Sequence, residues 1–216
     1  MNTMKNKHLN LAEHYSKTFK EYGDTTRGMD WASEHENILR FRILSEIFGF
    51  KSSEIEYSVL DFACGTSAFY EYLNSMPQIA KINYTGLDIN NELIECARRK
   101  YPKNKYLSGD ILNDKSIIKE KFDYIIINGL FTQKLDLSDD EMFSFWKDII
   151  SSLWNYSAKG IAFNTMSQFV DYKREGNYHL ETGIAGEFLK DSISNNFLIR
   201  NDYNLYETTF YIFKDY

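Results

Sequence analysis

Val59-Leu-Asp-Phe-Ala-Cys-Gly-Thr66 is the stretch of sequence that decides the fold. The apolar run that ends at Phe62 is typical of a short buried strand, and the small residues after it predict a tight turn into a helix. Gly65 lets the backbone approach a ligand closely, because no Cβ stands in the way. The carboxylate of Asp61 suits a cationic group of a ligand and disfavours a pyrophosphate at this turn.

Strand and helix patterns alternate through the rest of the chain. Apolar runs predict further strands over residues 82–87, 105–107, 122–127 and 160–164, with helical patterns between and after them. Two more strands flank a polar turn at residues 201–204. This order predicts an α/β, Rossmann-like fold: a seven-stranded, mostly parallel sheet with one antiparallel strand and helices on both faces.

The first part of the chain is polar and has a helical period. Apolar residues recur every four positions within residues 9–22, and Ser33 begins a second helix that Gly49 closes. We therefore expect an N-terminal helical cap, residues 1–56, that contributes to the cofactor and substrate site. The core, residues 57–216, follows it in one compact domain.

The composition disfavours several classes of protein. The chain has 216 residues and a formal net charge of −6, which argues against nucleic acid as the main partner. No apolar run reaches the roughly 18 residues of a membrane span, and the start lacks the apolar stretch of a signal peptide. Two distant cysteines, Cys64 and Cys96, indicate free thiols in a reducing cytoplasm. No spacing of His and Cys predicts a metal site.

Acidic residues also follow the second and third predicted strands. A carboxylate at Asp88 can accept hydrogen bonds from both hydroxyls of a ribose. Asp110 stands where it can accept a hydrogen bond from the amino group of an adenine. Because the carboxyl ends of parallel strands meet at one edge of the sheet, we expect Asp61, Asp88 and Asp110 to line one cleft.

These motifs resemble those of class I S-adenosylmethionine-dependent methyltransferases, from about Ser58 to the last strand. The matching stretches are VLDFACGT, YTGLDINNELIECARRKYP, YLSGDI and FDYIIINGLF. The closing hairpin also fits the extra antiparallel strand of that family, which NAD-binding relatives lack. The resemblance implies S-adenosyl-L-methionine as the cofactor and S-adenosyl-L-homocysteine as the product.

The resemblance implies a role for each residue of the first two motifs. Asp61 and Gly65 would line the methionine part of the cofactor, and Asp88 would hold its ribose. Ala63 stands where the family has the first glycine of its motif, so it is also placed at the cofactor. An alanine is acceptable at this position if its φ is negative.

The later motifs imply contacts with the adenine and the substrate. Ile89 would pack on the adenine, whose edge would be bound by Asp110 and the amide of Ile111, and Asn128 would border the sulfonium and the substrate. A narrower resemblance rests on GDTTRGMDWASE, INGLFTQKL, AFNTMSQFVD and RNDYNLYETTFYIF. These stretches are similar to a little-characterised subgroup that often accompanies surface-polysaccharide or small-molecule biosynthesis.

The N-terminal loop supplies further candidate contacts. The planar guanidinium of Arg27, in a loop flanked by glycines, suits the α-carboxylate of the cofactor. Trp31 could cover the methionine or the substrate as an aromatic lid. Tyr15, on the first predicted helix, is another candidate for the same crevice.

Methyl transfer to a hydroxyl benefits from a general base. His179, in the irregular stretch after the fifth predicted strand, and Glu34, beside the N-terminal loop, are both candidate bases. Asn128 is the catalytic candidate at the end of the fourth strand. Asn164 and Asp171 are further polar candidates at the mouth, whereas His8 and His14 are expected to be solvated.

We therefore predict an S-adenosylmethionine-dependent methyltransferase that O-methylates a small polar metabolite, such as a sugar or sugar-phosphate derivative. Three alternatives stay open: an RNA or protein methyltransferase of the same fold, a protein that binds the cofactor without catalysis, and a nicotinamide-dependent dehydrogenase. The acidic charge argues against a nucleic-acid substrate. The missing third-glycine fingerprint argues against the dehydrogenase.

Overall fold

The computed structural model of the chain describes residues 7–49, 56–76 and 81–214. Its strands are β1 (Glu56–Phe62), β2 (Lys81–Asp88), β3 (Lys105–Ser108), β4 (Phe122–Phe131), β5 (Ser157–Met166), β6 (Phe197–Arg200) and β7 (Glu207–Phe213). Its α-helices are α1 (Leu9–Tyr22), α2 (Glu34–Ser45), α3 (Ala68–Ser75), α4 (Asn91–Lys100), α5 (Asp139–Trp154) and α6 (Thr182–Ser192). Two short 3₁₀ helices, η1 (Glu46–Phe48) and η2 (Lys115–Ile117), complete the elements of the described ranges.

The strands form one sheet in the order β3-β2-β1-β4-β5-β7-β6. The pairs from β3 to β5 are all parallel, whereas β7 runs antiparallel to both of its neighbours, β5 and β6. The predicted fold class is therefore confirmed, including the single antiparallel strand contributed by the closing hairpin.

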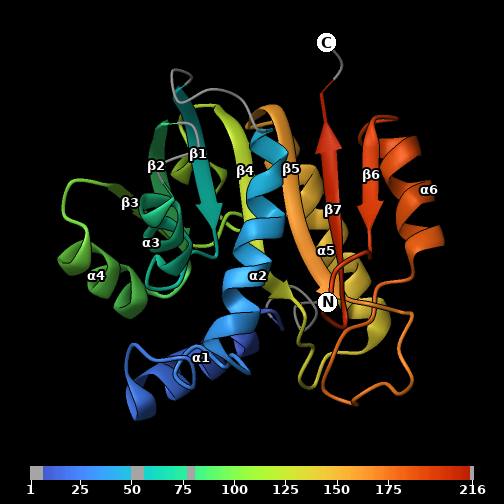
Figure 1. Ribbon diagram of the computed structural model, residues 1–216, viewed down its shortest axis with the longest axis horizontal. Helices are drawn as coiled ribbons and strands as arrows, with labels where there is room; N and C mark the ends of the chain where they lie inside the picture. Colours follow the sequence, from blue (N-terminus) through green and yellow to red (C-terminus); the bar gives the residue numbers. More distant parts are fainter. Residues whose placement is uncertain (1–6, 50–55, 77–80, 215–216) are drawn as a thin grey trace.

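Helices cover both faces of this sheet (Figure 1). The central strands are apolar on both sides, because successive side chains point to opposite faces. In β4, Tyr124 and Ile126 belong to the core beneath α2 and α3, while Ile125 and Ile127 belong to the core beneath α5 and α6. This explains why the strand reads as a continuous apolar run rather than as an alternating pattern.

The N-terminal helix has a different place. In Figure 1, α1 lies at the end of the sheet toward which the arrowheads of β1 and β5 point. It therefore stands over the carboxyl edge of the parallel strands. Gly23 ends α1 as expected, with a φ of 67° and an amide that donates to the carbonyl of Phe19.

Two elements differ from the predicted ones. β4 continues through Asn128 and Gly129 to Phe131, because β5 is also longer than predicted and pairs Thr165 with Phe131 after an irregularity in register. The second helix stops at Ser45 and is followed by η1. Ile38 of this helix is 45% exposed.

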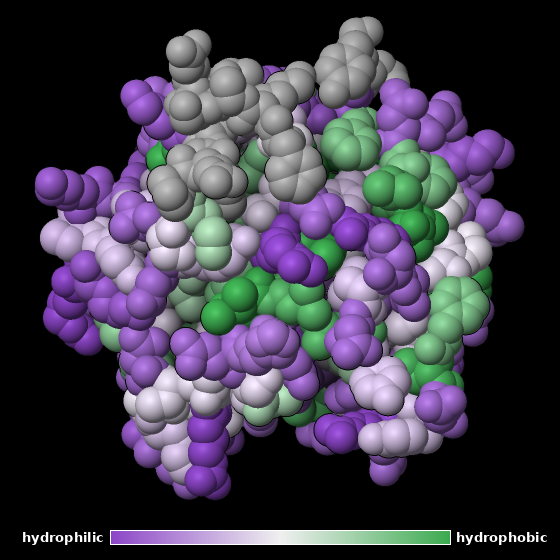
Figure 2. All heavy atoms as spheres, in the orientation of Figure 1, coloured by the Kyte–Doolittle hydropathy of each residue, from purple (hydrophilic) through white to green (hydrophobic). Residues whose placement is uncertain are grey.

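In the orientation of Figure 1, hydrophilic residues cover most of the left-hand side, and hydrophobic residues are visible near the centre and along the right-hand side (Figure 2). α2, which exposes Ile38, crosses the centre of this view. Among the described residues, none of the helices combines the length and the apolar content needed to cross a membrane.

Candidate active site

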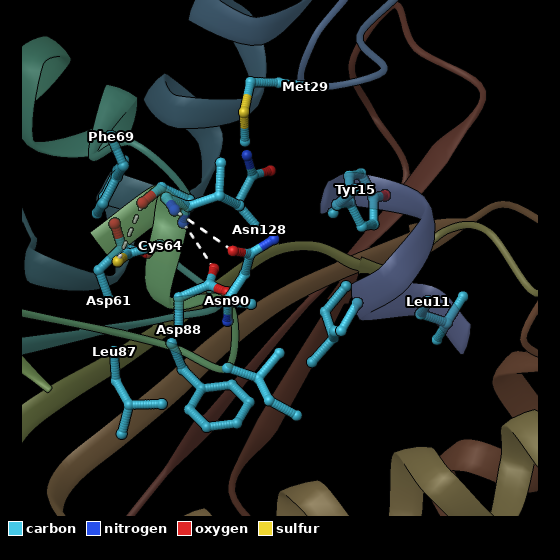
Figure 3. Close-up of a pocket in the computed structure, with 18 of the residues that line it drawn as sticks. Leu11, Tyr15, Met29, Asp61, Cys64, Phe69, Leu87, Asp88, Asn90 and Asn128 are labelled. Carbon is cyan, nitrogen blue, oxygen red and sulfur yellow. Dashed lines mark hydrogen bonds between the residues drawn. The ribbon is translucent and has the colours of Figure 1, made fainter. Parts of the chain in front are cut away.

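The sheet order places the predicted polar groups in one row. Asp110 follows β3, Asp88 ends β2, Asp61 lies in β1 and Asn128 in β4, and these strands are neighbours in that order. All four residues line one cavity of about 120 Å³. Figure 3 shows Asp61, Asp88 and Asn128 around it. The strand order reverses between β1 and β4, which is where open α/β sheets bind their ligands.

The turn between β1 and α3 has an unusual backbone. Ala63, Gly65 and Ser67 have φ values of 60°, 54° and 69°, all in the left-handed region. The condition of a negative φ at Ala63 is therefore not met. The amide of Cys64 donates to the carbonyl of Leu87 at 3.1 Å, which ties this turn to the end of β2. The conformation costs an alanine about 1–2 kcal/mol relative to the right-handed region.

Asp88 is held by two backbone hydrogen bonds. The amide of Gly65 donates to its Oδ2 at 2.9 Å, and the amide of Asn90 donates to its Oδ1 at 2.8 Å. Each carboxylate oxygen keeps a lone pair for another donor, which suits the two hydroxyls of a ribose. Burial raises the pKa of Asp88, and the amide hydrogen bonds oppose that rise.

A donor without a partner lies beside Asp88. The side-chain Nδ2 of Asn90 is buried, and it has no hydrogen-bond partner within residues 7–49, 56–76 and 81–214. Asn90 lines the same cavity. A buried polar group without a partner in the protein is a natural contact for a ligand, so this nitrogen fits an oxygen of a bound nucleoside.

Asp61 is the most deeply buried acid of the row, with 2% of its surface exposed. The hydroxyl of Tyr84 donates to its Oδ2 at 2.7 Å. Burial raises the pKa of Asp61 to about 7, the hydrogen bond from Tyr84 lowers it, and the charge of Asp88 raises it. A cationic ligand group would stabilise the ionised form of this carboxyl.

Asp110 has a partner that the sequence did not predict. His8 was expected to be solvated, but its side chain is only 11% exposed and its Nε2 lies 2.7 Å from Oδ2 of Asp110. The imidazole also stacks on Phe145, with ring centroids 5.4 Å apart. Asn113 donates to Oδ2 and the amide of Leu112 to Oδ1. One lone pair of Oδ1 is left for an adenine amino group.

The remaining predicted cofactor residues divide into two groups. Those that line the cavity are Trp31, Ala63, Gly65, Ile89 and Ile111. Arg27 does not line it: its guanidinium lies 3.8 Å from the centre of the Tyr22 ring and donates to the Tyr22 hydroxyl at 2.9 Å. Leu11, Tyr15 and Met29 add walls from the N-terminal segment, and Figure 3 shows Leu11 and Tyr15 on α1, across from the strand ends.

A larger groove of about 650 Å³ adjoins the cavity. Tyr15, Trp31, Asn128 and Gly129 line both, so the two spaces meet at these residues. Of the polar residues predicted at the mouth, His179 and Asp171 line the groove. Glu34 is exposed in the first turn of α2 and lines neither space.

The ring of His179 has a defined tautomer. Its Nδ1 lies 2.6 Å from the carbonyl oxygen of Ser167. Because a carbonyl oxygen only accepts, Nδ1 carries the hydrogen, and in the neutral ring Nε2 is left as an acceptor. Nε2 is buried and has no partner within the described residues. An imidazole nitrogen in this state is able to take a proton from a hydroxyl.

A chain of hydrogen bonds stands behind the border between cavity and groove. Arg40 donates to Oε1 of Glu207 at 2.6 Å, Asn164 donates to Oε2 of Glu207 at 2.7 Å, and the amide of Gly129 donates to Asn164 at 2.8 Å. Asn164 and Glu207 are almost fully buried. The network links α2, β7 and β5 to β4 and so fixes the backbone next to Asn128.

Arg40 and Glu207 were not predicted from the sequence. The sequence contains one indication of Glu207, since it is an acid at the start of a strand whose other residues are threonines and apolar residues. The sequence contains no such indication for the contact of His8, because its partner Asp110 is 102 positions away. Within the described residues, no group of His, Cys, Asp and Glu side chains is arranged to hold a metal ion.

The chain is similar to known proteins in one region of sequence and over its whole fold. Residues 59–153 match the family model described as a methyltransferase domain. No curated protein matches the sequence closely enough to count as a relative.

The fold is similar to those of several solved structures, and in three examples the match covers nearly all of the chain. The DhpI-SAM-HEP complex has a TM-score of 0.62 and 14% identity, and the match covers 98% of each chain. Magnesium protoporphyrin IX methyltransferase from Synechocystis PCC 6803, with bound SAH, has a TM-score of 0.58 and 10% identity over 97% of each chain. An S-adenosylmethionine-dependent methyltransferase from Clostridium acetobutylicum ATCC 824 has a TM-score of 0.55 and 16% identity, covering 95% of this chain and 98% of that one.

At these identities the solved structures establish the fold, and the sequence match adds the type of domain. Residues 59–153 thus match a methyltransferase domain, a domain that uses S-adenosylmethionine, and the sheet as a whole has the fold of the S-adenosylmethionine-dependent methyltransferases.

Proposed function

We propose that this chain is an S-adenosylmethionine-dependent methyltransferase that methylates a hydroxyl oxygen of a small polar metabolite, such as a sugar or sugar-phosphate derivative. The observation that carries the proposal is the meeting of the acid-lined cavity and the polar groove at Tyr15, Trp31, Asn128 and Gly129. Methyl transfer needs donor and acceptor in line and in contact, with water excluded. Two adjoining spaces with a shared border satisfy that need.

The cavity residues bind and orient the cofactor in this proposal. Asp88 accepts from the ribose hydroxyls, and Asp110 accepts from the adenine amino group beside the amide of Ile111. Ile89 packs on the adenine, and Asp61 faces the cationic amino group of the methionine part. When bound, the cofactor supplies a methyl carbon on a positively charged sulfur, which leaves as a neutral thioether.

His179 is the general base in this proposal. In the neutral ring its Nε2 is an acceptor, because Nδ1 carries the hydrogen and donates it in a hydrogen bond to the carbonyl of Ser167. As the new carbon–oxygen bond forms, the hydroxyl proton of the acceptor moves to Nε2, which leaves the methylated oxygen neutral. Glu34 is the weaker candidate, since it lines neither space. Asn128, on the shared border, orients the acceptor.

The expected N-terminal cap, residues 1–56, includes residues 1–6 and 50–55, which lie outside the described ranges. Its described part contributes to the site in this proposal, because α1 and the loop after it supply Tyr15 and Trp31 to both spaces. A sugar acceptor fits a role in surface-polysaccharide or small-molecule biosynthesis. The solved relatives are named for varied chemistry, including a magnesium protoporphyrin IX methyltransferase and a pyocyanin biosynthetic protein. Their names therefore do not favour one acceptor for this chain.

Binding of S-adenosylhomocysteine, measured by calorimetry, tests the proposal. Replacing Asp88 with alanine removes the two proposed charge-assisted hydrogen bonds to the ribose hydroxyls, each worth about 1.5–3 kcal/mol. The affinity for S-adenosylhomocysteine should therefore fall by at least about 100-fold. Asp136→Ala is the matched control, because Asp136 is exposed and lines neither space. Circular dichroism checks folding, and Asp88→Asn preserves the side-chain size if the alanine variant unfolds. Unchanged affinity in folded Asp88→Ala protein would refute the assigned cofactor site.

A further inference from the structure

Two buried hydrogen-bond acceptors without partners belong to residues that line the groove. They are Nε2 of His179 and Oδ1 of Asn128, and neither has a partner in the part of the chain that the structure describes. Both residues line the groove. No donor of the groove lining is similarly buried and unpaired among those described residues. Since buried polar atoms are nearly always paired, these two acceptors call for hydrogen-bond donors on the molecule that binds there.

Charge gives an independent indication about the same molecule. Asp30, Glu36, Asp171 and Glu207 line the groove against two guanidinium groups, those of Arg40 and Arg174, a formal charge of −2. Arg40 pairs with Glu207 at 2.6 Å and with Glu36 at 3.4 Å, and these three groups together still carry a formal charge of −1. The groove therefore repels an anion and favours a neutral or cationic compound.

The rim of the groove is aromatic. Tyr172 and Tyr206 both line it, and each is 66% exposed. Exposed tyrosines offer a flat apolar face together with a hydroxyl. Such rings suit the apolar face of a cyclic polyol, whose hydroxyls remain free to donate to the acceptors deeper in the groove.

We infer that the methyl acceptor is a cyclic polyhydroxylated compound that is uncharged or carries an amine, and not a phosphate ester or a carboxylate. This inference rests on the proposed function and chooses between the acceptors that it allows. Hydroxyl and ammonium groups donate to Asn128 and His179, whereas a phosphate dianion brings only acceptors and a repelled charge. One hydroxyl gives its proton to Nε2 as its oxygen forms the bond to the methyl carbon.

Fractionated metabolites provide the test. An ultrafiltrate of the native host cells is passed over an anion exchanger at about pH 8, where phosphate esters and carboxylates are retained, and neutral compounds and amines flow through. Each fraction is incubated with the full-length protein and S-adenosylmethionine carrying a labelled methyl group. We expect labelled product from the flow-through. Product from the retained fraction alone would overturn the inference.

The two ways of failing are separable. Product from the retained fraction alone would overturn the inference and leave the proposed methylation intact. If neither fraction is labelled although calorimetry shows that S-adenosylhomocysteine binds, the cofactor site is retained, but both the proposed methylation and the inference about the acceptor are wrong. If S-adenosylhomocysteine does not bind, the proposed function is wrong, and the inference that rests on it is wrong as well.

A charge variant adds a sharper readout. Asp171 is exposed and lines the groove, so Asp171→Lys changes the formal charge of the groove from −2 to zero with little risk to folding. Labelling of retained compounds relative to flow-through compounds should rise about threefold or more. Asp136→Lys makes the same charge change outside the groove and should leave the ratio unchanged. An equal ratio in both variants would contradict the charge argument.

Discussion

Asp61 offers the sharpest prediction about the energetics of the site. This carboxyl is 2% exposed, and burial raises its pKa to about 7 from an ordinary value of 3.8. In the unfolded chain it ionises near the ordinary value. Keeping it ionised in the folded protein therefore costs about 4 kcal/mol, since each pH unit between the two pKa values corresponds to about 1.4 kcal/mol.

The sign follows from proton binding. Between pH 3.8 and about 7 the folded protein holds a proton at Asp61 that the unfolded chain has lost, so the contribution of this group to stability falls as the pH rises. Below that window the cost is absent, and above it the cost is constant. Asp61→Asn removes the titrating group and keeps an oxygen for the hydroxyl of Tyr84.

Urea unfolding of the wild type and of Asp61→Asn measures this cost. The free energy of unfolding of the variant should exceed that of wild type by about 2 kcal/mol more at about pH 8 than at about pH 5.5. The reason is that the upper half of the pH window in which the cost of ionising Asp61 develops lies between these two pH values. Asp123→Asn is the control of opposite sign. The pKa of Asp123 is lowered although burial opposes this, because Ser58 and Lys159 bind its carboxylate, so neutralising it should cost stability at pH 8. An Asp61→Asn gain that is equal at both pH values would refute the argument.

Ligand binding reports on the same group. If the cationic end of the cofactor binds ionised Asp61, affinity for S-adenosylhomocysteine should fall about tenfold from about pH 8 to about pH 6, since a pKa of about 7 lies midway. The Asp61→Asn variant should bind more weakly at pH 8 and lose this dependence. If the affinity of the wild type does not change over that pH range, the ligand does not bind ionised Asp61.

Two further substitutions test how the cavity is built. His8→Ala should weaken binding of S-adenosylhomocysteine about fivefold, because His8 orients Asp110 through a hydrogen bond worth about 1 kcal/mol. Asp110 keeps a lone pair free for the adenine in the presence of His8. Tighter binding by the variant would mean instead that His8 blocks the adenine position. Gly65→Ala should lower stability by at least about 1 kcal/mol in thermal unfolding, since φ is 54° and the added Cβ would lie 2.5 Å from Cε of Met29; an unchanged melting temperature would contradict this.

The strand-end acids were predictable because they depend on local pattern alone. An apolar run marks each strand, and parallel strands send their carboxyl ends to one edge, so Asp61, Asp88 and Asp110 follow from the sequence without any knowledge of packing. The cavity that they share confirms this step. The same logic placed Asn128 at that edge, although β4 continues past it.

Features that depend on long-range contacts were not predictable in this way. Arg27 lies in the expected loop, but the nearby ring of Tyr22 attracts its guanidinium and holds it away from the cavity. Ala63 has a positive φ because its turn is tied to the carbonyl of Leu87 on another strand. His8 meets Asp110 only because α1 lies over the sheet edge. No local sequence pattern contains these partners.

The two halves of the proposed reaction also differ in where their residues lie along the chain. The strand-end groups of the cavity, Asp61, Asp88, Asp110 and Asn128, all fall within residues 59–153, the region that matches a methyltransferase domain.

The groove is different. Of the residues that line it, only Asn128, Gly129, Thr132 and Gln133 lie within residues 59–153. Its other walls come from the N-terminal segment and from residues 166–207, which the domain model does not include. A match to the domain therefore carries information on the methyl donor and almost none on the acceptor. The acceptor has to be deduced from the charges and unpaired hydrogen-bond acceptors of the groove itself, and these favour a donor-rich compound without a negative charge.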